Sequence, residues 1–365
     1  MSFNPLLSGV RVLDLSCLLP GPFCTLYLAQ MGAEVIKVEE PRGGDYARAL
    51  SPDLFDLVNR GKKSVTLDLR QAQDRSRFLD LVATADAVLE SFRPGVMDKL
   101  GCGFEAARQR NPRIVFAALT GYGQTGPYRD RAGHDINYRG YAGELDQCGQ
   151  YGQAPSPGNF QVADLAGGAL TCLAGILAAL FGARASGVGT FVDAAMLDGT
   201  LALQVLSLST VRQLGNPAPR GGDMLTGALP SYAVYECADG KHIAVGALEP
   251  KFFQALIQAV GQPELSRLPL APGPGGDALR AALTDLFKRK PRDEWEQLLA
   301  HLETCVSAVL SPAEALQNEQ VRSRALIEMV GGKQAIGLPL KFSHAHAHGG
   351  QSPKLGAHNA EILGD

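Results

Sequence analysis

RVLDLSCLLPGPFCTLYLAQMGAEVIKVE, residues 11–39, is the stretch of the chain that decides the fold class. It opens with a short apolar strand, Arg11–Ser16, and closes with a second one, Glu34–Glu39. Between them a Pro-Gly-Pro turn leads into Pro22–Met31, whose composition is typical of a helix. A strand, a helix and a further strand in this order predict a right-handed crossover between two parallel strands.

The same alternation continues through the first third of the chain. Asp74–Thr84 carries apolar residues at helical spacing, Asp86–Ser91 is strand-like, and Arg113–Leu119 is a candidate for a buried strand. We therefore expect an α/β fold in which helices cover a Rossmann-like parallel sheet. The first turn, SCLLPGPFC, is not the GxGxxG of dinucleotide-binding proteins, so a nicotinamide enzyme is not indicated. Ligands of such a sheet bind at the carboxyl ends of its strands.

The composition changes at Gly215–Pro230, where glycine, proline and small residues mark a domain hinge. Beyond this hinge, Ser231–Glu236 and His242–Val245 predict a β-hairpin. Amphipathic helices are expected near Lys251–Val260 and Ala278–Phe287. This region has the pattern of a separate, smaller α+β domain.

The domain boundaries follow from these patterns. We expect a large α/β domain made of residues 1–213 with 325–365, and a small α+β domain made of residues 214–324. Prolines and glycines bracket Gly337–Ser343, which is therefore expected to form an edge strand of the large domain.

Composition and charge argue against several classes of protein. The hydrophobic content of 45% and the charged content of 19% are ordinary for a globular protein. The formal net charge of -3 argues against broad capture of nucleic acid. The seven cysteines include no CxxC pair, so neither a disulfide framework nor a zinc ribbon is indicated. We expect free thiols in a reducing compartment, with the cytoplasm as the default location.

One segment, Leu165–Gly182, is long and uncharged enough to cross a membrane. Glycine and alanine dominate it, Asp164 stands at its start, and no aromatic belt flanks it. A helix that is apolar all round is also expected in the core of a large protein. We therefore expect a core helix and no membrane contact.

Three residues are candidates for chemistry, and each also has a plain structural explanation. His134 follows a turn-rich loop, and a lone histidine is more often structural than catalytic. Asp164 precedes the long apolar helix, where aspartate is a favoured N-cap. Glu249 precedes Pro250 at the start of a predicted helix. Taken singly, none of the three indicates a function.

Longer strings of sequence are more specific. They include NPRIVFAALTGYGQTGPY at 111–128, AGHDINY at 132–138, ADLAGG at 163–168 and GALEP at 246–250. On these strings the chain resembles, nearly end to end, the class III coenzyme A-transferase superfamily and, within it, the 2-methylacyl-CoA racemases. The first string occurs in transferases as well, whereas AGHDINY followed by GALEP is more specific to the racemase branch.

The resemblance implies the class III CoA-transferase fold and an isomerase that inverts the 2-position of a 2-methylacyl-CoA thioester. Inversion through a planar enolate requires an acid/base group on each face of the reacting carbon. The resemblance assigns His134, oriented by Glu249, to one face and Asp164 to the other. Free N–H groups at the helix start beside Asp164 are expected to stabilise the enolate oxygen.

Two other functions stay open at this point. A class III CoA-transferase would use Asp164 as a nucleophile, forming a mixed anhydride, and would not need His134 or Glu249. A catalytically silent protein would bind acyl-CoA and leave its α-hydrogen in place. The joint presence of the three residues favours the racemase.

The phosphates of CoA require cationic partners. Racemases commonly show an arginine directly before the proline of the EEP string, where this chain has Glu40; Lys37 and Arg42 are the nearby candidates to replace it. The resemblance assigns the remaining contacts to Asn59, Arg60, Gly61, Lys62 and Arg93 for CoA, and to Gly133, Asp135, Ile136, Asn137 and Tyr138 for the thioester end.

The resemblance also implies an interlocked homodimer, in which Glu249 and His134 of one active site can belong to different chains. The reaction needs no metal and no separate cofactor, because coenzyme A is part of the acyl-CoA substrate. The tract with His344, His346 and His348 is therefore interpreted as a polar tail and not as a metal site.

Overall fold

The computed structural model describes residues 6–345, 347 and 349–364. The chain forms two compact units. The first unit consists of Met1–Glu144, Asn159–Gln204 and Glu319–Asp365, and the second consists of Leu145–Gly158 and Val205–Asn318.

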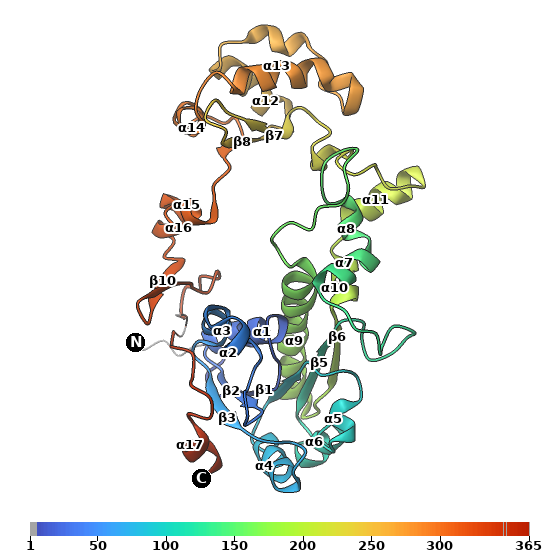
Figure 1. The fold of residues 1–365 in the computed structure, drawn as a ribbon, viewed down its shortest axis with the longest axis vertical. Coiled ribbons are helices and arrows are strands. Elements are labelled where there is room, and N and C mark those ends of the chain that lie inside the picture. The colour runs from blue at the N-terminus through green and yellow to red at the C-terminus, as the bar shows by residue number, and fades with distance from the viewer. Residues whose placement is uncertain (1–5, 346, 348, 365) are drawn as a thin grey trace. The chain divides into compact units, whose positions relative to one another are not determined.

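A six-stranded parallel sheet lies at the centre of the first unit (Figure 1). Its spatial order, β3-β2-β1-β4-β5-β6, is that of the doubly wound dinucleotide-binding fold. The parallel sheet expected from the sequence is therefore confirmed, although the glycine fingerprint of that fold is absent from the first turn. The strands are β1 (Arg11–Asp14), β2 (Glu34–Glu39), β3 (Lys63–Thr66), β4 (Ala87–Glu90), β5 (Val115–Thr120) and β6 (Phe191–Ala195).

Helices follow most of these strands. They are α1 (Pro20–Gln30), α2 (Ala47–Leu50), α3 (Pro52–Asn59), α4 (Ala72–Val82), α5 (Val96–Lys99), α6 (Phe104–Arg110), α7 (Asp135–Ala142), η1 (Ala163–Leu170), α9 (Thr171–Ser186), α10 (Met196–Ala202), α16 (Glu319–Ser323) and α17 (Asn359–Leu363). A short helix, α8 (Glu144–Gln147), lies where the chain passes from the first unit to the second.

Alternate residues of the central strands belong to two separate cores. Val12 and Ala117 lie in one apolar cluster, together with residues of α1 and α9. Leu13 and Phe116 lie in the other, together with residues of α4 and α6. Because successive side chains of a strand point to opposite faces, helices cover both faces of the sheet (Figure 1).

The expected edge strand at Gly337–Ser343 is wrong. The strand in this region is β11 (Lys333–Ile336), which pairs antiparallel with β10 (Ile327–Val330). Gly331 and Gly332 both have positive φ angles, 57° and 82°, which lets the chain reverse between these two strands. The hairpin therefore ends before Gly337, and Pro339 has no N–H with which to extend the pairing.

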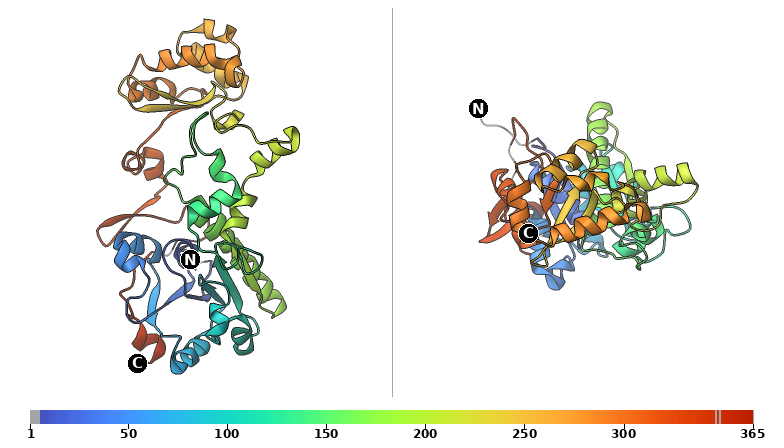
Figure 2. Two further views of the ribbon diagram at one scale, coloured as in Figure 1. Left: turned by 45° about the vertical axis from the view of Figure 1, so that its right-hand side comes forward. Right: turned by 90° about the horizontal axis from the view of Figure 1, so that it is seen from above.

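The second unit contains an antiparallel sheet of β7 (Tyr232–Glu236), β8 (His242–Gly246) and β9 (Val306–Ala308). Helices α12 (Pro250–Ala259), α13 (Asp277–Phe287) and α14 (Arg292–Leu299) build one core with these strands (Figure 2). The predicted hairpin and both predicted helices are confirmed. The remaining elements are α11 (Val205–Leu214), η2 (Met224–Thr226), η3 (Pro263–Arg267), η4 (Gly273–Gly276) and α15 (Pro312–Ala315).

The compact units divide at other positions than the boundaries expected from composition. The chain enters the second unit at Val205 and leaves it after Asn318, and residues 145–158 also belong to the second unit. The Gly- and Pro-rich stretch Gly215–Pro230 lies inside this unit, after α11. It is a loop of the second unit, which is why its composition changes without marking the boundary.

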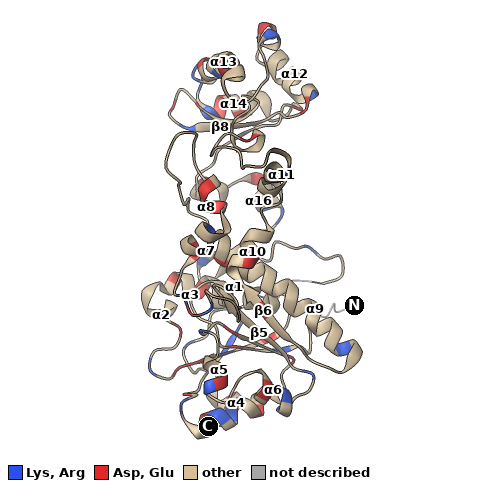
Figure 3. Ribbon diagram, turned by 90° about the vertical axis from the view of Figure 1, so that its right-hand side faces the viewer, with Lys and Arg blue, Asp and Glu red and all other residues tan. Residues whose placement is uncertain are grey.

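The long apolar segment forms one continuous helix of 24 residues, Ala163–Ser186, whose first turns are π-helical. By length and composition alone this helix would suit a membrane span, and Figure 3 shows hardly any charge along α9. Cys172, Ile176 and Leu180 lie in the first apolar cluster, against the sheet. One face of the helix thus packs into the core of the first unit, as expected, whereas Phe181 on another face is 79% exposed.

Candidate active site

His134 occupies the N-cap position of α7, in the loop that follows the carboxyl end of β5. Its backbone is extended, with φ −129° and ψ 176°. The His134 N–H donates to Oδ1 of Asn137 at 3.0 Å, and its carbonyl accepts from the Asn137 N–H at 2.8 Å. These two bonds fix the backbone of His134, while its side chain stays partly exposed and accessible to a substrate.

Asp164 is the second residue of η1, and Val162 holds the N-cap position. The expectation that Asp164 caps this helix is therefore wrong. The cap comes from another helix, because Oδ1 of Asp135 accepts from the N–H groups of Ala163 at 2.7 Å and Asp164 at 3.2 Å. These two N–H groups already have a partner and do not face a ligand as the sequence led us to expect. The Asp164 carboxyl is free of the capping role.

The environment of Asp164 changes its protonation. Its pKa is raised from 3.8 to about 6, chiefly by burial and next by the nearby carboxylate of Asp135, while His134 acts in the opposite direction. The effect of His134 places the imidazole within electrostatic range of the Asp164 carboxyl. A pKa of about 6 is close to that of an ordinary imidazole, about 6.5. The site thus holds a carboxyl group in the electrostatic range of an imidazole, and this carboxyl can exchange protons near neutral pH.

Backbone contact with α10 holds the π-helical turn that carries Asp164. A Cβ on Gly199 would lie 1.9 Å from the Gly167 carbonyl oxygen, and a Cβ on Gly167 would lie 2.4 Å from Oγ1 of Thr200. Only glycine at both positions permits this approach of the two backbones. π-Helical turns occur often at functional sites, and here the turn is fixed by close packing.

Glu249 lies in the second unit, after β8, at the N-cap position of α12. Its side chain is exposed and makes no capping hydrogen bond. The three predicted catalytic residues therefore divide between the units, with His134 and Asp164 in the first and Glu249 in the second.

Lys62, assigned to CoA by resemblance, lies in the interior of the first unit. Its Nζ donates to Oδ2 of Asp14 at 3.0 Å, to the Pro22 carbonyl at 2.9 Å and to Oδ1 of Asn59 at 2.9 Å. Burial lowers the pKa of Lys62 to about 8, and the charge of Asp14 opposes this shift. All three ammonium protons are bonded within the protein, so Lys62 has none left for a phosphate.

The neighbours of Lys62 are also bonded internally. Arg60 is 3% exposed, and its guanidinium pairs with Glu328 at 3.2 Å and donates to the Ile336 carbonyl. Nδ2 of Asn59 donates to the Phe55 carbonyl at 3.1 Å. Gly61, with φ 76°, donates its N–H to the Gln351 carbonyl at 3.0 Å. Residues 59–61 therefore link the end of α3 to the β10–β11 hairpin and to Gln351.

Arg42 and Arg93 have a different environment. Arg42 follows β2 and Arg93 follows β4, so both come after carboxyl ends of the sheet. Both side chains are exposed, and among the residues that the structure describes neither guanidinium has a hydrogen-bond or ion-pair partner. Glu40 accepts from the Arg42 N–H at 2.8 Å and pairs with Arg70 at 3.3 Å. Arg42 and Arg93 are thus the assigned cations that remain available to an anionic ligand.

Residues Gly133–Tyr138 divide between exposed and buried positions. Ile136 and Asn137 are exposed beside His134. Tyr138 is 6% exposed, and its hydroxyl donates to the Gly133 carbonyl. A Cβ on Gly133 would lie 2.7 Å from the Tyr138 ring, which explains the glycine. Burial raises the pKa of Tyr138 to about 12. Tyr138 therefore supports the loop before His134, and little of its surface is accessible to a ligand.

Glu90 is a buried carboxyl that was not anticipated from the sequence. Glu90, the last residue of β4, is 5% exposed, and its Oε2 accepts from the Phe92 N–H at 2.6 Å. Burial raises its pKa to about 8. The signal that could have found it is a glutamate that ends an otherwise apolar strand, AVLE, directly before the FRPG string.

No group of three His, Cys, Asp or Glu side chains suited to a metal occurs among the described residues. His346 and His348 of the histidine tract lie outside that set.

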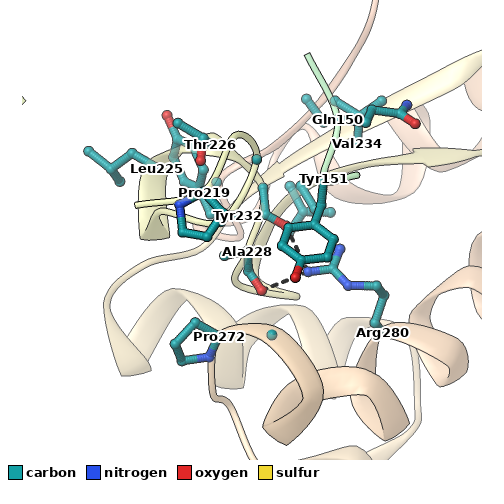
Figure 4. Close-up of a pocket in the computed structure, with 18 of the residues that line it drawn as sticks. Gln150, Tyr151, Pro219, Leu225, Thr226, Ala228, Tyr232, Val234, Pro272 and Arg280 are labelled. Atoms are coloured by element: carbon teal, nitrogen blue, oxygen red, sulfur yellow. Dashed lines mark hydrogen bonds between the residues drawn. The ribbon is translucent and has the colours of Figure 1, made fainter. Parts of the chain in front are cut away.

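The second unit contains a cavity of about 1300 Å³ over β7, β8 and β9 (Figure 4). Its lining is largely apolar and includes Leu225, Tyr232 and Val234. Arg280 brings a guanidinium to it and donates to the carbonyls of Gly227 and Ala228 at 2.7 and 2.8 Å. The cavity is large enough for an apolar organic group.

Comparison with known proteins shows the family of the chain. Residues 7–359 match the model of CoA-transferase family III. The chain is 37% identical to the alpha-methylacyl-CoA racemase of Mus musculus over 98% of this chain and 92% of that protein. It is 33% identical to the acetyl-CoA:oxalate CoA-transferase of Acetobacter aceti over 97% of this chain and 94% of that protein. The crystal structure of a CAIB/BAIF family protein from Brucella suis matches with a TM-score of 0.88 and 29% identity, covering 100% of this chain and 99% of that one. With its fold and nearly its whole length shared in this way, the chain belongs to CoA-transferase family III.

Proposed function

We propose that this acyl-CoA enzyme is a racemase that inverts the 2-position of 2-methylacyl-CoA thioesters. The observation that carries the proposal is that Asp164, whose pKa is raised to about 6, lies within electrostatic range of His134. An acid/base group on each face suits a reaction that must run in both directions, because each group must act as base for one epimer and as acid for the other.

The proposed mechanism has two proton transfers. In one direction, Asp164 or His134 removes the α-hydrogen, and the electron pair of the C–H bond moves into the thioester to form an enolate. The other residue then donates a proton to the opposite face of the same carbon, and the enolate returns to the thioester. Each turnover leaves the two residues with exchanged protonation states, which proton exchange with water restores.

The enolate oxygen needs hydrogen-bond donors. The N–H groups at the start of η1 are bonded to Asp135. The first N–H groups of α7, those of Asp135 and Ile136, have no acceptor among the described residues. They follow His134 directly and lie at the positive end of the helix dipole. We assign the stabilisation of the enolate oxygen to these two groups.

Substrate binding and assembly are part of the same proposal. Arg42 and Arg93 are the proposed partners of the CoA phosphates, since both guanidinium groups are exposed and unpaired within the described residues. Glu249 is proposed to orient His134, and the chain is proposed to act as a homodimer, in keeping with the racemase resemblance.

A second candidate function is CoA transfer between carboxylic acids. It is favoured by relatives of nearly full length, such as the transferase of Acetobacter aceti at 33% identity. In that reaction the Asp164 carboxylate would attack the thioester, and neither His134 nor Glu249 would be needed.

Proton NMR of a single epimer of a 2-methylacyl-CoA in deuterated water tests the proposal. We expect the α-hydrogen signal to disappear while both epimers accumulate, with no acceptor acid present. Thioester transfer after addition of carboxylic acids, without α-hydrogen exchange, would instead identify a transferase. Retention of the thioester and its α-hydrogen under both conditions would contradict both enzymatic candidates.

A further inference from the structure

Asp135 connects the two helices that carry the proposed acid/base residues. It is the first residue of α7 and directly follows His134. Its Oδ1 accepts from the N–H groups of Ala163 and Asp164, the first two residues of η1. One carboxylate oxygen thus joins the start of the His134 helix to the start of the Asp164 helix.

The second oxygen of Asp135 is also occupied. Oδ2 pairs with Arg139, one turn further along α7, at 3.3 Å. The Arg139 side chain is only 4% exposed and also pairs with Glu144 at 2.6 Å. Because a buried arginine with two carboxylate partners has little freedom, the Asp135 carboxylate is fixed from both sides. Its oxygens are therefore committed within the protein, although the sequence resemblance assigns Asp135 to the thioester site.

Helix η1 needs such a partner from outside. The first N–H groups of a helix have no acceptor within it, and an N-cap side chain normally supplies one. Val162 stands at the N-cap position here, and its side chain has no acceptor. Asp135 takes over that function from a segment nearly thirty residues earlier in the chain.

We propose that Asp135 is a positioning residue, whose carboxylate holds the first turn of η1, and with it Asp164, against the start of α7 beside His134. This inference rests on the proposed racemase function. Besides position, Asp135 supplies a negative charge: after burial, it is the largest cause of the raised pKa of Asp164. The Asp135 carboxylate therefore sets both the place and the basicity of Asp164 from within the protein, while only the backbone N–H of this residue is directed at the enolate oxygen.

Two substitutions separate these effects. Asp135→Asn keeps an oxygen that can accept from the Ala163 N–H but removes the charge. With this variant we expect the acidic limb of the kcat profile to move to lower pH, because the pKa of Asp164 falls. Asp135→Ala removes the acceptor as well, and we expect kcat to fall about a hundredfold or more, the range typical of a displaced acid/base group. KM should change little in either variant, because the Asp135 side chain is bonded within the protein and makes no substrate contact.

Amide hydrogen exchange supplies a readout that does not depend on activity. Peptides covering residues 161–170 should exchange faster in Asp135→Ala than in the wild type, and much less so in Asp135→Asn. Glu105→Gln is the matched control, since it removes a carboxylate charge from an exposed ion pair with Arg108 on α6 and leaves Asp135 and Arg139 unchanged. Its activity and its exchange in this segment should match the wild type.

The outcomes are distinct. A wild-type protein that leaves the α-hydrogen in place would refute the proposed function, while the exchange measurement would still test the structural link. Active variants with an unchanged pH profile and unchanged amide exchange would overturn the role of Asp135. A raised KM at constant kcat would also overturn it, because that result identifies a substrate contact.

Discussion

At the scale of single residues, the site contains a carboxyl group whose surroundings disfavour its ionised form. Asp164 is partly buried next to a second carboxylate, and its pKa rises to about 6. For a protein that only had to fold, this arrangement would be unfavourable at neutral pH, since a buried ionised carboxylate is destabilising. Such perturbed groups cluster at functional sites, and here the group interacts with His134.

If His134 and Asp164 act on opposite faces, substitutions of the two should give complementary results. His134→Ala is expected to abolish inversion and to retain α-hydrogen exchange with only one epimer, the one deprotonated by Asp164. Asp164→Asn should retain exchange only with the other epimer. NMR in deuterated water, with each pure epimer in turn, measures both. Exchange of both epimers in either variant would show that one base serves both faces.

The carboxyl of Glu90 gives a pH-dependent prediction. Its folded pKa, about 8, lies above the unfolded value, so the folded state holds an extra proton between about pH 4.5 and 8. The protonated Glu90 therefore makes its full contribution to the free energy of unfolding below the pKa of the unfolded state. This contribution is lost as the pH rises through the pKa of the folded state. The free energy of unfolding of Glu90→Gln, compared with that of the wild type, should therefore increase by about 1 kcal/mol for each pH unit over this window.

Denaturant unfolding of the two proteins at pH 5, 6, 7 and 8 measures this difference. Asp98→Asn is the matched control, since Asp98 contributes only a minor cause to the shift of Glu90. A difference between wild type and Glu90→Gln that stays constant with pH would contradict the prediction.

At the scale of elements, the contact between η1 and α10 determines where Asp164 stands. Gly167 and Gly199 bring the two backbones into direct contact, so a side chain at either position must push the helices apart. The same contact fixes a π-helical turn, which a sequence pattern with a period of 3.6 residues does not reveal.

Gly199→Ala should therefore damage both stability and activity. The added Cβ would lie 1.9 Å from a backbone oxygen, and we expect a loss of about 1–3 kcal/mol in unfolding free energy together with slower inversion. Gly182→Ala in α9 is the matched control, because a Cβ there would meet no atom within 4 Å beyond its own helix backbone and chain neighbours, and helix propensity favours alanine. Thermal unfolding and the NMR assay compare the two; equal stability in both variants would refute the packing argument.

The predictability of each element follows from its own residues. β1, α1 and β2 were foreseeable because apolar strands flank a proline-marked helix start. β3, with the sequence KSVT, and β6, with FVDAA, carry polar residues within short strands, so their periodicity is weak. His134 and Asp164 were identified through family strings, whereas the cap from Asp135 depends on tertiary contact and has no local signal. The interior position of Lys62 was likewise unforeseeable, since lysine is usually exposed.

At the scale of the whole chain, the first unit is completed by residues distant in sequence. β3 is an edge strand of the six-stranded sheet, and the segment around α17 lies along it. The Thr66 N–H donates to Oδ1 of Asn359 at 2.9 Å, and Nδ2 of Asn359 donates to Oγ1 of Thr66 at 2.8 Å. The Ser64 N–H donates to Nδ1 of His358 at 3.1 Å. An exposed strand edge is covered in this way.

Asn359→Ala should loosen this cover. It leaves the Thr66 N–H without its acceptor, and we expect a loss of about 1–3 kcal/mol in unfolding free energy and faster amide exchange in β3. Glu361→Ala, which removes a mostly exposed ion pair with Lys63, should cost less than about 1 kcal/mol. Denaturant unfolding and hydrogen exchange are measured for both variants. Equal losses of unfolding free energy in the two would mean that the side chain of Asn359 does not protect the edge of β3.

The cover of β3 also has a consequence for biosynthesis. The residue that bonds Thr66 is translated 293 positions after it. All six strands of the sheet leave the ribosome before Asn359 does. Until then the edge of β3 stays uncovered and accessible to other chains. We therefore expect unfinished chains to pair along β3 more readily than finished chains, in which Asn359 occupies this edge.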